Sequence, residues 1–436
     1  MNITGLIVEY NPFHNGHIYH LKKSLEKTSA DASIAVMSGN FIQRGEPAIF
    51  DKFSRAKSAV ESGVDLVLEL PSIYASQSAE FFAKGAISLL NSLKCVNSIC
   101  FGSEDGDINI LKTIASILSS EPDEFKSSLS NYLNNGMLFP SARNKALLEY
   151  INSPYFSSNY NLNHVDLSEE RLNAVLGSPN NILGIEYIKQ LISLNSDIKP
   201  FTIGRIESDY NSEVMSGNIN SATAVRKKIH EILSNDLIFD SKEITDSIPN
   251  STLNMILSNL KNNFYPVYPE DFFDIIVSTI IRDKKNLNSF FDVSEGIENK
   301  IFKSALVAQN YDELIQMIKS KRYTMTRVKR CLNNILLNIT KEDMIFAKSI
   351  DTIPYARILA FNDKGREIIK EIKKSSEIKI INKFSEIEHF MDDDTFKFLI
   401  QNDIKCTDLY DTVYYKKNRP LLKGSMDYFT KPIYVK

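Results

Sequence analysis

The sequence predicts an α/β fold, a Rossmann-like, doubly wound parallel sheet followed by a mainly α-helical C-terminal domain. Three observations lead to this prediction. Apolar, β-branched runs alternate with amphipathic helical segments through the first hundred residues. These runs are almost continuously apolar, as strands are when helices cover both faces of a parallel sheet. Beyond about residue 236 the alternation fades and helix-like segments dominate.

Strands and helices are expected in a regular order at the start of the chain. The predicted strands are 3–10, 32–39, 65–71 and 98–104, and the predicted helices are 16–28, 51–63 and 76–94. Asp51 is a typical N-cap for the second helix, and Gly63 is a typical residue to end it. Because crossovers between parallel strands are right-handed, this order favours a doubly wound sheet.

The rest of the chain is less regular. Residues 107–176 are helical with Ser- and Asn-rich joints, and we interpret them as an insertion carried by the sheet domain. The alternation then returns with a helix at 180–194, a strand at 199–206 and a helix at 221–233. We therefore predict a catalytic domain at 1–235 and a mainly helical domain at 236–436. A final segment, from YDTVYYKK to PIYVK, is aromatic and β-prone.

Composition narrows the class of protein. A chain of 436 residues is too long for one ordinary core, and 43% apolar with 24% charged residues is typical of a soluble globular protein. No apolar stretch reaches the roughly 20 residues that span a bilayer, and MNITGLIVEY reads as a buried strand rather than a secretory signal. The net charge of −3 means that a nucleic acid could bind only through a local basic surface. The scattered cysteines, expected as reduced thiols in the cytoplasm, are Cys95, Cys100, Cys331 and Cys406.

The turn between the first predicted strand and helix carries the chemistry. It reads EYNPFHNGH from Glu9 to His17, and it lies at the carboxyl end of a strand, where ligands bind in open parallel sheets. The helix that follows is expected to present unpaired N–H groups and a partial positive charge to phosphate. Gly16 lets a phosphate approach the backbone closely, and His14 and His17 can donate hydrogen bonds to phosphate oxygens. We interpret the turn as a phosphate-binding site for ATP.

Two other interpretations of the turn compete with this one. The first is a pair of surface histidines beside an ordinary turn. The second is a metal site, since His14, His17 and His20 are evenly spaced, although no cysteine or carboxylate pair at ligand spacing joins them. The position of the turn directly after the first strand favours phosphate over both.

The sequence lacks the GxxxxGK[ST] and GxGxxG phosphate loops. Its His-x-Gly-His segment instead resembles the motif of the nucleotidyltransferase superfamily, which includes the class I aminoacyl-tRNA synthetases and attacks the α-phosphate of ATP. Further segments are similar to the tRNA(Met) cytidine acetate ligase family: VEYNPFHNGHIYHL, AVMSGNFIQRGEPAIFDKFSRAKSAVESGVDLVLELP, FGSEDGDI, PNNILGIEY, SATAVRK, KRYTMTRVKR and PYARILAFNDKG. The similarity runs nearly end to end and is weaker across 107–175 and after about residue 370.

This resemblance implies a nucleotidyltransferase fold of the HxGH type and a ligase activity. Members of the family activate acetate with ATP as acetyl-adenylate, releasing pyrophosphate, and they need no acetyl-CoA. They pass the acetyl group to the exocyclic amine of the wobble cytidine in elongator tRNA(Met), which gives N4-acetylcytidine and AMP. The implied partners are therefore ATP, acetate and tRNA(Met), with no membrane, and Mg²⁺ is expected beside the phosphates.

The resemblance also carries residue roles, with His14 and His17 as the catalytic residues. The nucleotide-binding residues that it implies are Ile7, Val8, Glu9, Tyr10, Asn11, Pro12, Phe13, His14, Asn15, Gly16, His17, Ile18, Tyr19, His20, Gly102, Asn180 and Arg205. Ser221, Thr223 and Arg226 resemble the second phosphate-binding motif of the superfamily, with a plain N-cap and a solvated arginine as the alternative.

The loop after the second predicted strand is a further candidate. Asn40, Gln43, Arg44 and Glu46 lie there, at the same edge of the sheet as the histidine turn. Loops at that edge usually carry specificity, so an acetate or cytidine contact competes with a purely structural loop.

A basic run stands out against the acidic chain. Residues 319–330, KSKRYTMTRVKR, contain no acid, and on a helix Arg322, Thr326, Lys329 and Arg330 would share one face. We interpret the run as a surface for tRNA phosphates, against the alternative of an ordinary solvated helix.

Two other residues bear on RNA binding. Tyr323, inside the run, could stack on a base, but a core position is expected for it. Arg357, in PYARIL, is a weaker candidate for RNA contact.

Two rival functions stay open on the sequence. An adenylyltransferase acting on a small phosphate-bearing precursor needs only about the first half of the chain. A non-catalytic RNA-binding protein with a vestigial nucleotide fold would have no need of His14 and His17. The choice of acetate and of cytidine rests on the resemblance alone.

Overall fold

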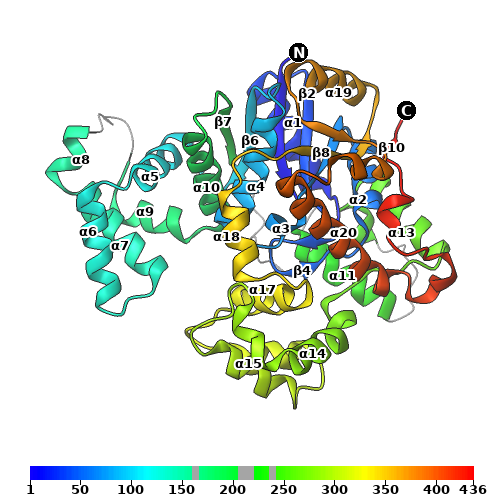
Figure 1. The fold of residues 1–436 in the computed structure, drawn as a ribbon. Helices are drawn as coiled ribbons and strands as arrows, with labels where there is room; N and C mark the ends of the chain where they lie inside the picture. Colours follow the sequence, from blue (N-terminus) through cyan, green and yellow to red (C-terminus); the bar gives the residue numbers. More distant parts are fainter. Residues whose placement is uncertain (160–165, 205–219, 235–241) are drawn as a thin grey trace. The chain divides into compact units, whose positions relative to one another are not determined.

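The computed structural model describes residues 1–159, 166–204, 220–234 and 242–436. These residues form two compact units, and Figure 1 traces the chain through both. The first unit contains residues 1–96 together with the described residues from 220 to the end, and the second contains 97–159 and 166–204. Each unit combines parallel strands with helices.

The first unit is built on a mostly parallel sheet. Its strands are β1 (Ile3–Val8), β2 (Ala32–Ser38), β5 (Leu66–Leu70), β8 (Tyr355–Phe361), β9 (Lys379–Ile381) and β10 (Ile433–Tyr434). They lie in the order β10-β8-β5-β2-β1, with β9 also paired to β8. β1, β2 and β5 are parallel, with Ile3 opposite Ala32 and Ile34 opposite Leu66. Every residue of β2 and β5 is buried, so the prediction of parallel strands buried on both faces is confirmed.

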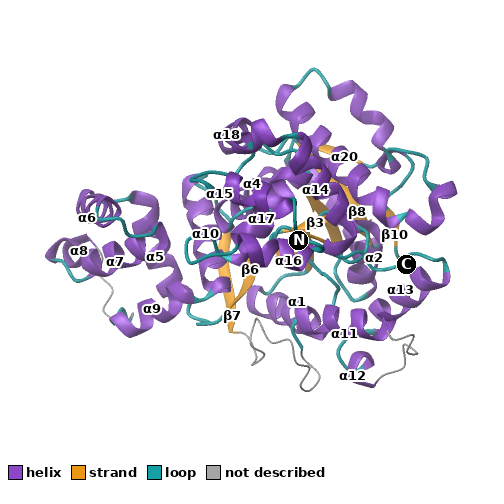
Figure 2. Ribbon diagram, turned by 90° about the horizontal axis from the view of Figure 1, so that it is seen from below, coloured by secondary structure: helices purple, strands orange, loops and turns teal. Residues whose placement is uncertain are grey.

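Helices surround this sheet (Figures 1 and 2). Those before β8 are α1 (Asn15–Thr28), α2 (Lys52–Glu61), α3 (Ser72–Ala75), α4 (Ala79–Ser92), α11 (Ala222–Ser234), α12 (Lys242–Thr245), α13 (Asn250–Lys261), α14 (Phe273–Arg282), α15 (Ile297–Ala305), α16 (Tyr311–Ile318), α17 (Met325–Leu336) and α18 (Lys341–Ser349). α19 (Asp363–Ser375) and α20 (Asp394–Tyr414) follow β8. As predicted, Asp51 caps α2, because its carboxylate accepts hydrogen bonds from the amides of Phe53 and Ser54 at 2.9 and 3.0 Å.

Shorter elements complete the first unit. A hairpin follows β2, formed by β3 (Phe41–Ile42) and β4 (Glu46–Pro47). The 3₁₀ helices are η1 (Pro269–Phe272), η2 (Lys284–Ser289), η3 (Phe384–Phe390), η4 (Lys416–Leu421) and η5 (Met426–Tyr428).

The second unit has one strand pair and a set of helices. β6 (Ser98–Ser103) runs parallel to β7 (Lys199–Gly204), with Ser98 opposite Lys199. The helices are α5 (Ile108–Ser120), α6 (Asp123–Asn134), α7 (Phe139–Ile151), α8 (Pro154–Asn159), α9 (Glu169–Gly177) and α10 (Pro179–Ser193). The stretch predicted as a helical insertion thus contains α5 to α9.

The C-terminal region is helical but also adds strands that the sequence prediction missed. β8 is almost entirely buried and pairs antiparallel with β5, and β9 and β10 pair parallel with β8. The prediction that YDTVYYKK is a β segment is wrong, since it forms the end of α20 and the start of η4. Tyr410 and Tyr414, four residues apart, both point into the core, and this spacing suits a helix. In PIYVK, β10 confirms the predicted strand.

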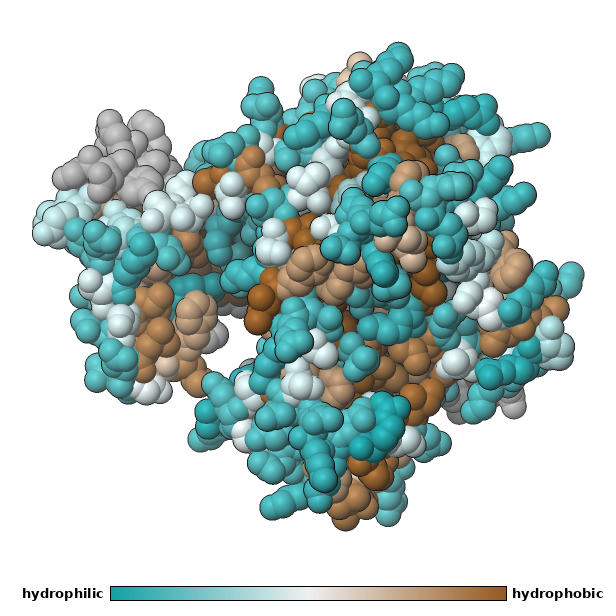
Figure 3. Space-filling view, viewed as in Figure 1, coloured by the Kyte–Doolittle hydropathy of each residue, from teal (hydrophilic) through white to brown (hydrophobic). Residues whose placement is uncertain are grey.

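Several charged side chains lie inside the first unit. The residues that are at most 2% exposed are Lys52, Arg55, Glu69, Arg357, Asp403 and Asp427. Figure 3 shows that hydrophilic side chains cover most of the displayed face. Within the described ranges, no helix is long and apolar enough to cross a membrane.

Candidate active site

The two histidines of the HNGH turn cap helix α1. His14 is the N-cap, and its Nδ1 accepts a hydrogen bond from the amide of Gly16 at 3.1 Å. The Nδ1 of His17 accepts one from the amide of His14 at 3.2 Å, so the two residues form a capping box. Their ring centroids are 3.8 Å apart. His14 is only 7% exposed, so it is not an ordinary surface histidine.

These caps determine which ring nitrogen carries the proton. A neutral imidazole has one donor and one acceptor nitrogen, and Nδ1 is the acceptor in both rings. The neutral tautomer of each ring therefore has its proton on Nε2. Both histidines can offer an Nε2–H donor to an anion without giving up the cap.

The prediction that the backbone amides at the start of α1 are unpaired is wrong for Asn15, Gly16 and His17. The amide of Asn15 donates to the carbonyl of Ser247 at 3.0 Å, and the amide of His17 donates to the carbonyl of His14 at 2.8 Å. The amide of Gly16 is taken by the His14 ring. Donors for a phosphate at this helix end must therefore come mainly from side chains.

Three side chains from three helices hold the carbonyls of the turn. Arg55 of α2 donates to the carbonyl of Glu9, and Arg226 of α11 donates to that of Asn11 at 2.9 Å. Thr252 of α13 donates through Oγ1 to the carbonyl of Phe13 at 2.8 Å. Three alternate carbonyls, those of Glu9, Asn11 and Phe13, are thus bound, and this fixes the backbone that leads to the histidines.

The SATAVR segment packs directly on this turn. Ser221 Oγ accepts a hydrogen bond from the amide of Ala224 at 3.1 Å, so Ser221 is an N-cap, as the alternative interpretation of this segment expected. The alternative of a solvated arginine is wrong, because the Arg226 guanidinium bonds to Asn11 and also to Thr223 Oγ1 at 3.2 Å. The two segments predicted to bind phosphate therefore lie together in the first unit.

Two hydrogen bonds and an ion pair connect the loop after β2 to other segments of the first unit. Asn40 Oδ1 accepts the amide of Lys52 at 3.0 Å, and the amide of Gln43 donates to Glu9 Oε1 at 2.9 Å. Glu46 forms an ion pair with Lys329. These bonds favour the structural interpretation for Asn40 and Glu46, while the bond from Gln43 links this loop to the histidine turn.

The second unit contains the other described nucleotide candidates. Gly102 lies on β6 opposite Ile203 of β7, and Asn180 lies in the first turn of α10. Glu104, just after β6, accepts hydrogen bonds from Asn180 Nδ2 at 2.6 Å and from the amide of Asn181 at 3.0 Å. The structure thus connects the end of β6 to the start of α10. Arg205 lies outside the described residues.

A metal site of histidines is not supported. Among the residues that the structure describes, no group of three or more His, Cys, Asp or Glu side chains could hold a metal ion.

Four of the six cations in the basic run 319–330 form ion pairs with acids of the protein, namely Arg322, Arg327, Lys329 and Arg330. α17 begins only at Met325, so Arg322 is not on the helix and the predicted shared face is wrong. Arg327 lies 3.5 Å from Glu295, and Arg330 lies 3.4 Å from Asp292. These pairs could not be predicted from the run itself, because the acids come from distant segments.

The two other residues considered for RNA contact, Tyr323 and Arg357, are both buried. Tyr323 is buried, as expected, and its hydroxyl donates to the carbonyl of Glu295 at 2.6 Å. The prediction that Arg357 contacts RNA is wrong, because it is 2% exposed on β8 and bonds to both carboxylate oxygens of Asp427 at 2.8 Å.

Comparison with known proteins shows the family of this chain. A family model described as HIGH Nucleotidyl Transferase matches residues 1–423. The chain is 48% identical over 434 residues to the tRNA(Met) cytidine acetate ligase of Clostridium perfringens, covering 99% of each chain. It is 43% identical over 438 residues to that of Alkaliphilus metalliredigens, covering 100% of this chain and 99% of the relative. The chain belongs to the tRNA(Met) cytidine acetate ligase family.

Solved structures of the family extend this agreement to the fold. The apo crystal structure of Thermotoga maritima TmcAL has a TM-score of 0.89 and 32% identity, and the match covers 100% of both chains. A second crystal structure of that protein, bound with alpha-thio ATP, has a TM-score of 0.87 and 32% identity over 100% of this chain and 99% of the other. The predicted fold of the nucleotidyltransferase type is therefore confirmed.

In this member of the tRNA(Met) cytidine acetate ligase family, sequence reasoning missed the residues that fix the histidine turn. Arg55 and Thr252 bind the carbonyls of Glu9 and Phe13 from helices that are distant in sequence. For Arg55, the only indication of a buried role in the sequence was its position as a charged residue on a predicted helix with apolar residues. Nothing in the sequence indicated the role of Thr252.

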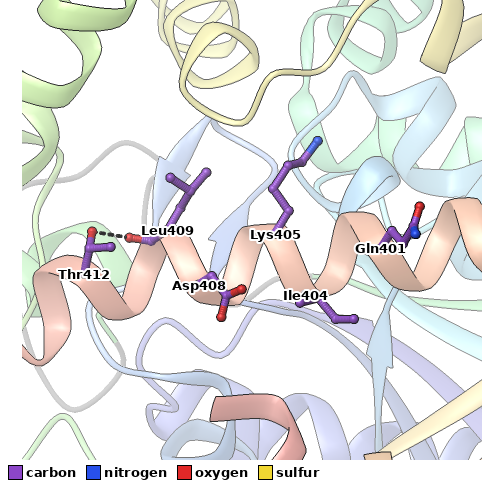
Figure 4. Close-up of a pocket in the computed structure, with 6 residues that line it drawn as sticks. All are labelled: Gln401, Ile404, Lys405, Asp408, Leu409 and Thr412. Carbon is purple, nitrogen blue, oxygen red and sulfur yellow. Dashed lines mark hydrogen bonds between the residues drawn. The ribbon is translucent and has the colours of Figure 1, made fainter. Parts of the chain in front are cut away.

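A shallow depression of about 440 Å³ lies along α20 and contains none of the candidate residues (Figure 4). Its lining consists of Gln401, Ile404, Lys405, Asp408, Leu409 and Thr412. All six belong to one helix, and Lys405 donates to the carbonyl of Asn338 at 3.2 Å. The depression is therefore not part of the candidate active site.

Proposed function

We propose that this chain is a ligase that activates acetate with ATP and transfers the acetyl group to the wobble cytidine of elongator tRNA(Met). The product is N4-acetylcytidine. The observation that carries the proposal is the pair of histidines on the turn between β1 and α1, each with Nδ1 bound to a backbone amide and Nε2 protonated. Relatives 42–48% identical over nearly the whole chain bear the name of this ligase, and they supply the acid and the nucleoside.

The first step is attack of an acetate oxygen on the α-phosphorus of ATP. A carboxyl O–P bond forms, the bond from the α-phosphorus to the bridging oxygen of the β-phosphate breaks, and pyrophosphate leaves with the electron pair. Two anions meet in this step, so donors that offset the growing charge lower the barrier. We assign this role to the Nε2–H groups of His14 and His17, with Arg226 beside them.

The second step transfers the acetyl group. The exocyclic amine of the cytidine attacks the carbonyl carbon of acetyl-adenylate, a C–N bond forms, and AMP leaves as the C–O bond breaks. The amine loses one proton in this step. A closed turn that holds the adenylate away from water favours transfer over hydrolysis.

We propose the nucleotide contacts that the resemblance implies: the turn and its flanks from Ile7 to His20 and, in the second unit, Gly102 and Asn180, with Arg205 as a further contact. The FGSE and PNNIL segments, which carry Gly102 and Asn180, are bonded to one another through Glu104. That bonding supports a common role for the two segments.

Mg²⁺ is proposed only as a companion of the nucleotide. Mg²⁺ is commonly bound by one or two carboxylates together with substrate phosphates rather than by a protein cage. The lack of a cage of three such ligands among the described residues is compatible with this mode. When bound, the ion would neutralise phosphate charge, and every role assigned above belongs to the side chains of the protein.

We further propose that residues 1–235 carry the adenylation chemistry and residues 236–436 carry tRNA binding. The closeness of His14, Arg226 and Thr252 supports a nucleotide site formed largely by the N-terminal part. Thr252 lies on the C-terminal side of this division, so the helical part also holds the turn in place.

The test is an incubation of the protein with ATP, acetate and elongator tRNA(Met), followed by mass analysis of nucleosides, with each component omitted in turn. We expect N4-acetylcytidine only when all three are present and without acetyl-CoA. Adenylation of a small phosphate-bearing compound with no tRNA product would instead support an ordinary adenylyltransferase. Variants that lack both imidazoles, H14N/H17N, are expected to yield no product.

A further inference from the structure

A second basic surface lies at the C-terminal end of helix α13. Beyond α20 the chain contains a single acid, Asp427, which is buried in an ion pair with Arg357. The basic residues in this segment are Lys416, Lys417, Arg419, Lys423, Lys431 and Lys436. In a chain with a net charge of −3, this is a strong local excess of positive charge.

The segment is anchored beside the end of α13. Asn418 Nδ2 donates to the carbonyl of Asn262 at 2.6 Å, and Lys417 Nζ lies 3.8 Å from the ring centroid of Tyr265. Phe264 stacks on Tyr414 with 5.0 Å between centroids. In Figure 1 the red end of the chain accordingly lies beside α13. We call the exposed side chains gathered here the α13–η4 surface: Lys261, Tyr265, Lys416, Lys417, Arg419 and Lys423.

The cations of the α13–η4 surface differ from those of the run 319–330. None of its five cationic side chains forms an ion pair with a carboxylate of the described ranges, whereas Arg327, Lys329 and Arg330 each do. An unpaired surface cation holds only mobile counterions, which a nucleic acid displaces on binding. Among the described residues, the α13–η4 surface therefore presents five cations without a carboxylate partner, whereas the run presents two, Lys319 and Lys321.

Helix α13 connects this surface to the histidine turn. Thr252, near its start, holds the carbonyl of Phe13, and Lys261 is its last residue. Nine residues of α-helix span about 14 Å, a distance that a few nucleotides of RNA can bridge. An RNA whose backbone lay on the α13–η4 surface could thus present a nearby base to the turn.

We propose that the α13–η4 surface binds the phosphodiester backbone of the RNA substrate. Lys261, Lys416, Lys417, Arg419 and Lys423 contact phosphates, and Tyr265, 39% exposed, adds an aromatic ring of the kind on which unpaired bases stack. This inference rests on the proposed function for the identity of the RNA, but it concerns residues outside the nucleotide site.

The test compares two triple variants with equal loss of charge, K416A/K417A/R419A on the surface and K370A/K373A/K374A on α19. Affinity for elongator tRNA(Met) is measured over a series of KCl concentrations. We expect the surface variant to bind at least about tenfold more weakly and its slope of log affinity against log salt to fall by about two to three, since each lost phosphate contact removes about one. The α19 variant should match the unaltered protein.

Two further measurements distinguish a loss of RNA binding from a loss of adenylation activity or of folding. Acetate-dependent exchange of pyrophosphate into ATP reports adenylation without RNA, and it should be unchanged in the surface variant. The single variant K416E, whose Nζ makes no hydrogen bond to a described residue, repeats the test with little risk to folding.

Unchanged affinity and salt slope in the surface variants would overturn the proposal, as would an equal loss in the α19 variant. A loss seen instead in K319A/K321A would assign the RNA to the run 319–330 and likewise overturn it. Failure of the unaltered protein to catalyse exchange would count against the proposed adenylation, which is a separate result from tRNA affinity.

Discussion

His14 and His17 each cap helix α1, and the proposed mechanism gives the same rings a chemical role. Nδ1 accepts a backbone amide and thereby closes the first turn of α1, which leaves Nε2 as the protonated nitrogen. The cap also orients the ring, so the donor is fixed in direction before any nucleotide binds. A substitution that removes the imidazole therefore has two effects, and they must be separated.

Replacing His14 by asparagine separates them. Asparagine is among the best N-cap residues, so H14N keeps an acceptor for the amide of Gly16 but loses the Nε2–H donor. We expect kcat for acetylation to fall by about 100-fold or more, as for loss of one transition-state donor, with the thermal midpoint within a few degrees of the unaltered protein.

The matched variant is H14A, which also removes the cap. It should lose about 1 kcal/mol of unfolding free energy in addition to the activity. Full kcat in H14N would show that His14 is only a cap.

The buried carboxyl group of Asp411 is expected to make the stability of the protein depend on pH. It is 4% exposed, and its Oδ2 has no hydrogen-bond partner among the described residues. Burial raises the pKa of this carboxyl to about 8, and the charge of Asp427 adds to the increase. An aspartate in an unfolded chain has a pKa of about 3.9.

The sign of the pH dependence follows from these values. Between about pH 4 and pH 8 the unfolded chain has lost this proton while the folded protein retains it, so stability falls as pH rises, by up to about 1.4 kcal/mol per pH unit. D411N cannot titrate. We measure the unfolding free energies of D411N and of the unaltered protein by urea denaturation. We expect the value for D411N minus the value for the unaltered protein to increase steadily from about pH 5 to about pH 8. A difference that stays constant with pH would contradict the buried neutral carboxyl.

At the scale of elements, the histidine turn depends on helices that are far apart in sequence. α2, α11 and α13 each supply one side chain to a carbonyl of the turn. Arg55 also donates to the carbonyls of Phe50 and Ser38, at 2.9 and 3.1 Å, and so joins the ends of β1 and β2. Burial lowers the pKa of Arg55, but several backbone carbonyls satisfy its guanidinium.

The contact of α19 with β5 gives a stability test at this scale. A Cβ added at Gly365, near the start of α19, would lie 2.1 Å from the carbonyl oxygen of Asp65, and backbone cannot move away as a flexible side chain can. We expect G365A to lower the unfolding free energy by about 1–3 kcal/mol or more, as overpacking does. The control is G177A, on α9, where a Cβ would meet nothing within 4 Å.

Thermal and urea denaturation measure both variants. G177A should be neutral or slightly stabilising, because alanine is the better helix former. Equal stability of G365A and the unaltered protein would mean that α19 does not pack on β5 as closely as described.

At the scale of the whole first unit, a buried set of charges binds the two ends of the chain together. Lys52 of α2 lies 2.8 Å from Glu69 of β5 and 3.2 Å from Asp427 of η5. Arg357 of β8 contacts the same two acids at 3.0 and 2.8 Å. Burial alone would raise the pKa of Asp427, but Arg357 and Lys52 outweigh it and hold the value at about 2.

Removing one member of this set should be costly. D427N leaves two buried cations facing one carboxylate, and breaking a buried pair typically costs about 3–5 kcal/mol. The control is D363N, whose exposed carboxylate pairs with Arg366 at the surface. Urea denaturation should show a large loss for D427N and no change for D363N, and a small loss for D427N would refute the importance of the network.

The same network limits the use of truncation. A chain cut within α20 would leave Lys52 without Thr407 and Asp427, both of which it contacts. We expect such a fragment to unfold, so its inactivity would say nothing about which half performs adenylation. Point variants in the full chain are the better tool.

The sequence predicted the parts of this molecule that depend on local pattern. The strands β1, β2 and β5, the cap at Asp51 and the position of the HNGH turn follow from apolar runs, helical spacing and N-cap chemistry. Pairing between distant segments was not predictable in the same way. β8 is an apolar run in a region that the sequence predicts to be helical, and its pairing with β5, β9 and β10 makes it a strand.

The candidate site shows the same limit. The histidines and SATAVR could be chosen from their order along the chain, but the bond from Arg226 to Asn11 spans 215 residues and has no sequence signal. The ion pairs of the basic run could not be predicted for the same reason, because Glu46, Asp292 and Glu295 come from distant segments.

In the proposed reaction a carboxylate oxygen attacks the α-phosphorus of ATP beside His14 and His17. Acetate labelled with ¹⁸O in both oxygens, followed by mass analysis of the AMP formed during tRNA acetylation, traces this oxygen. We predict one ¹⁸O atom in each AMP, since the attacking oxygen stays on phosphorus when the acetyl group leaves. Unlabelled AMP, or label found in inorganic phosphate alongside ADP, would contradict this account.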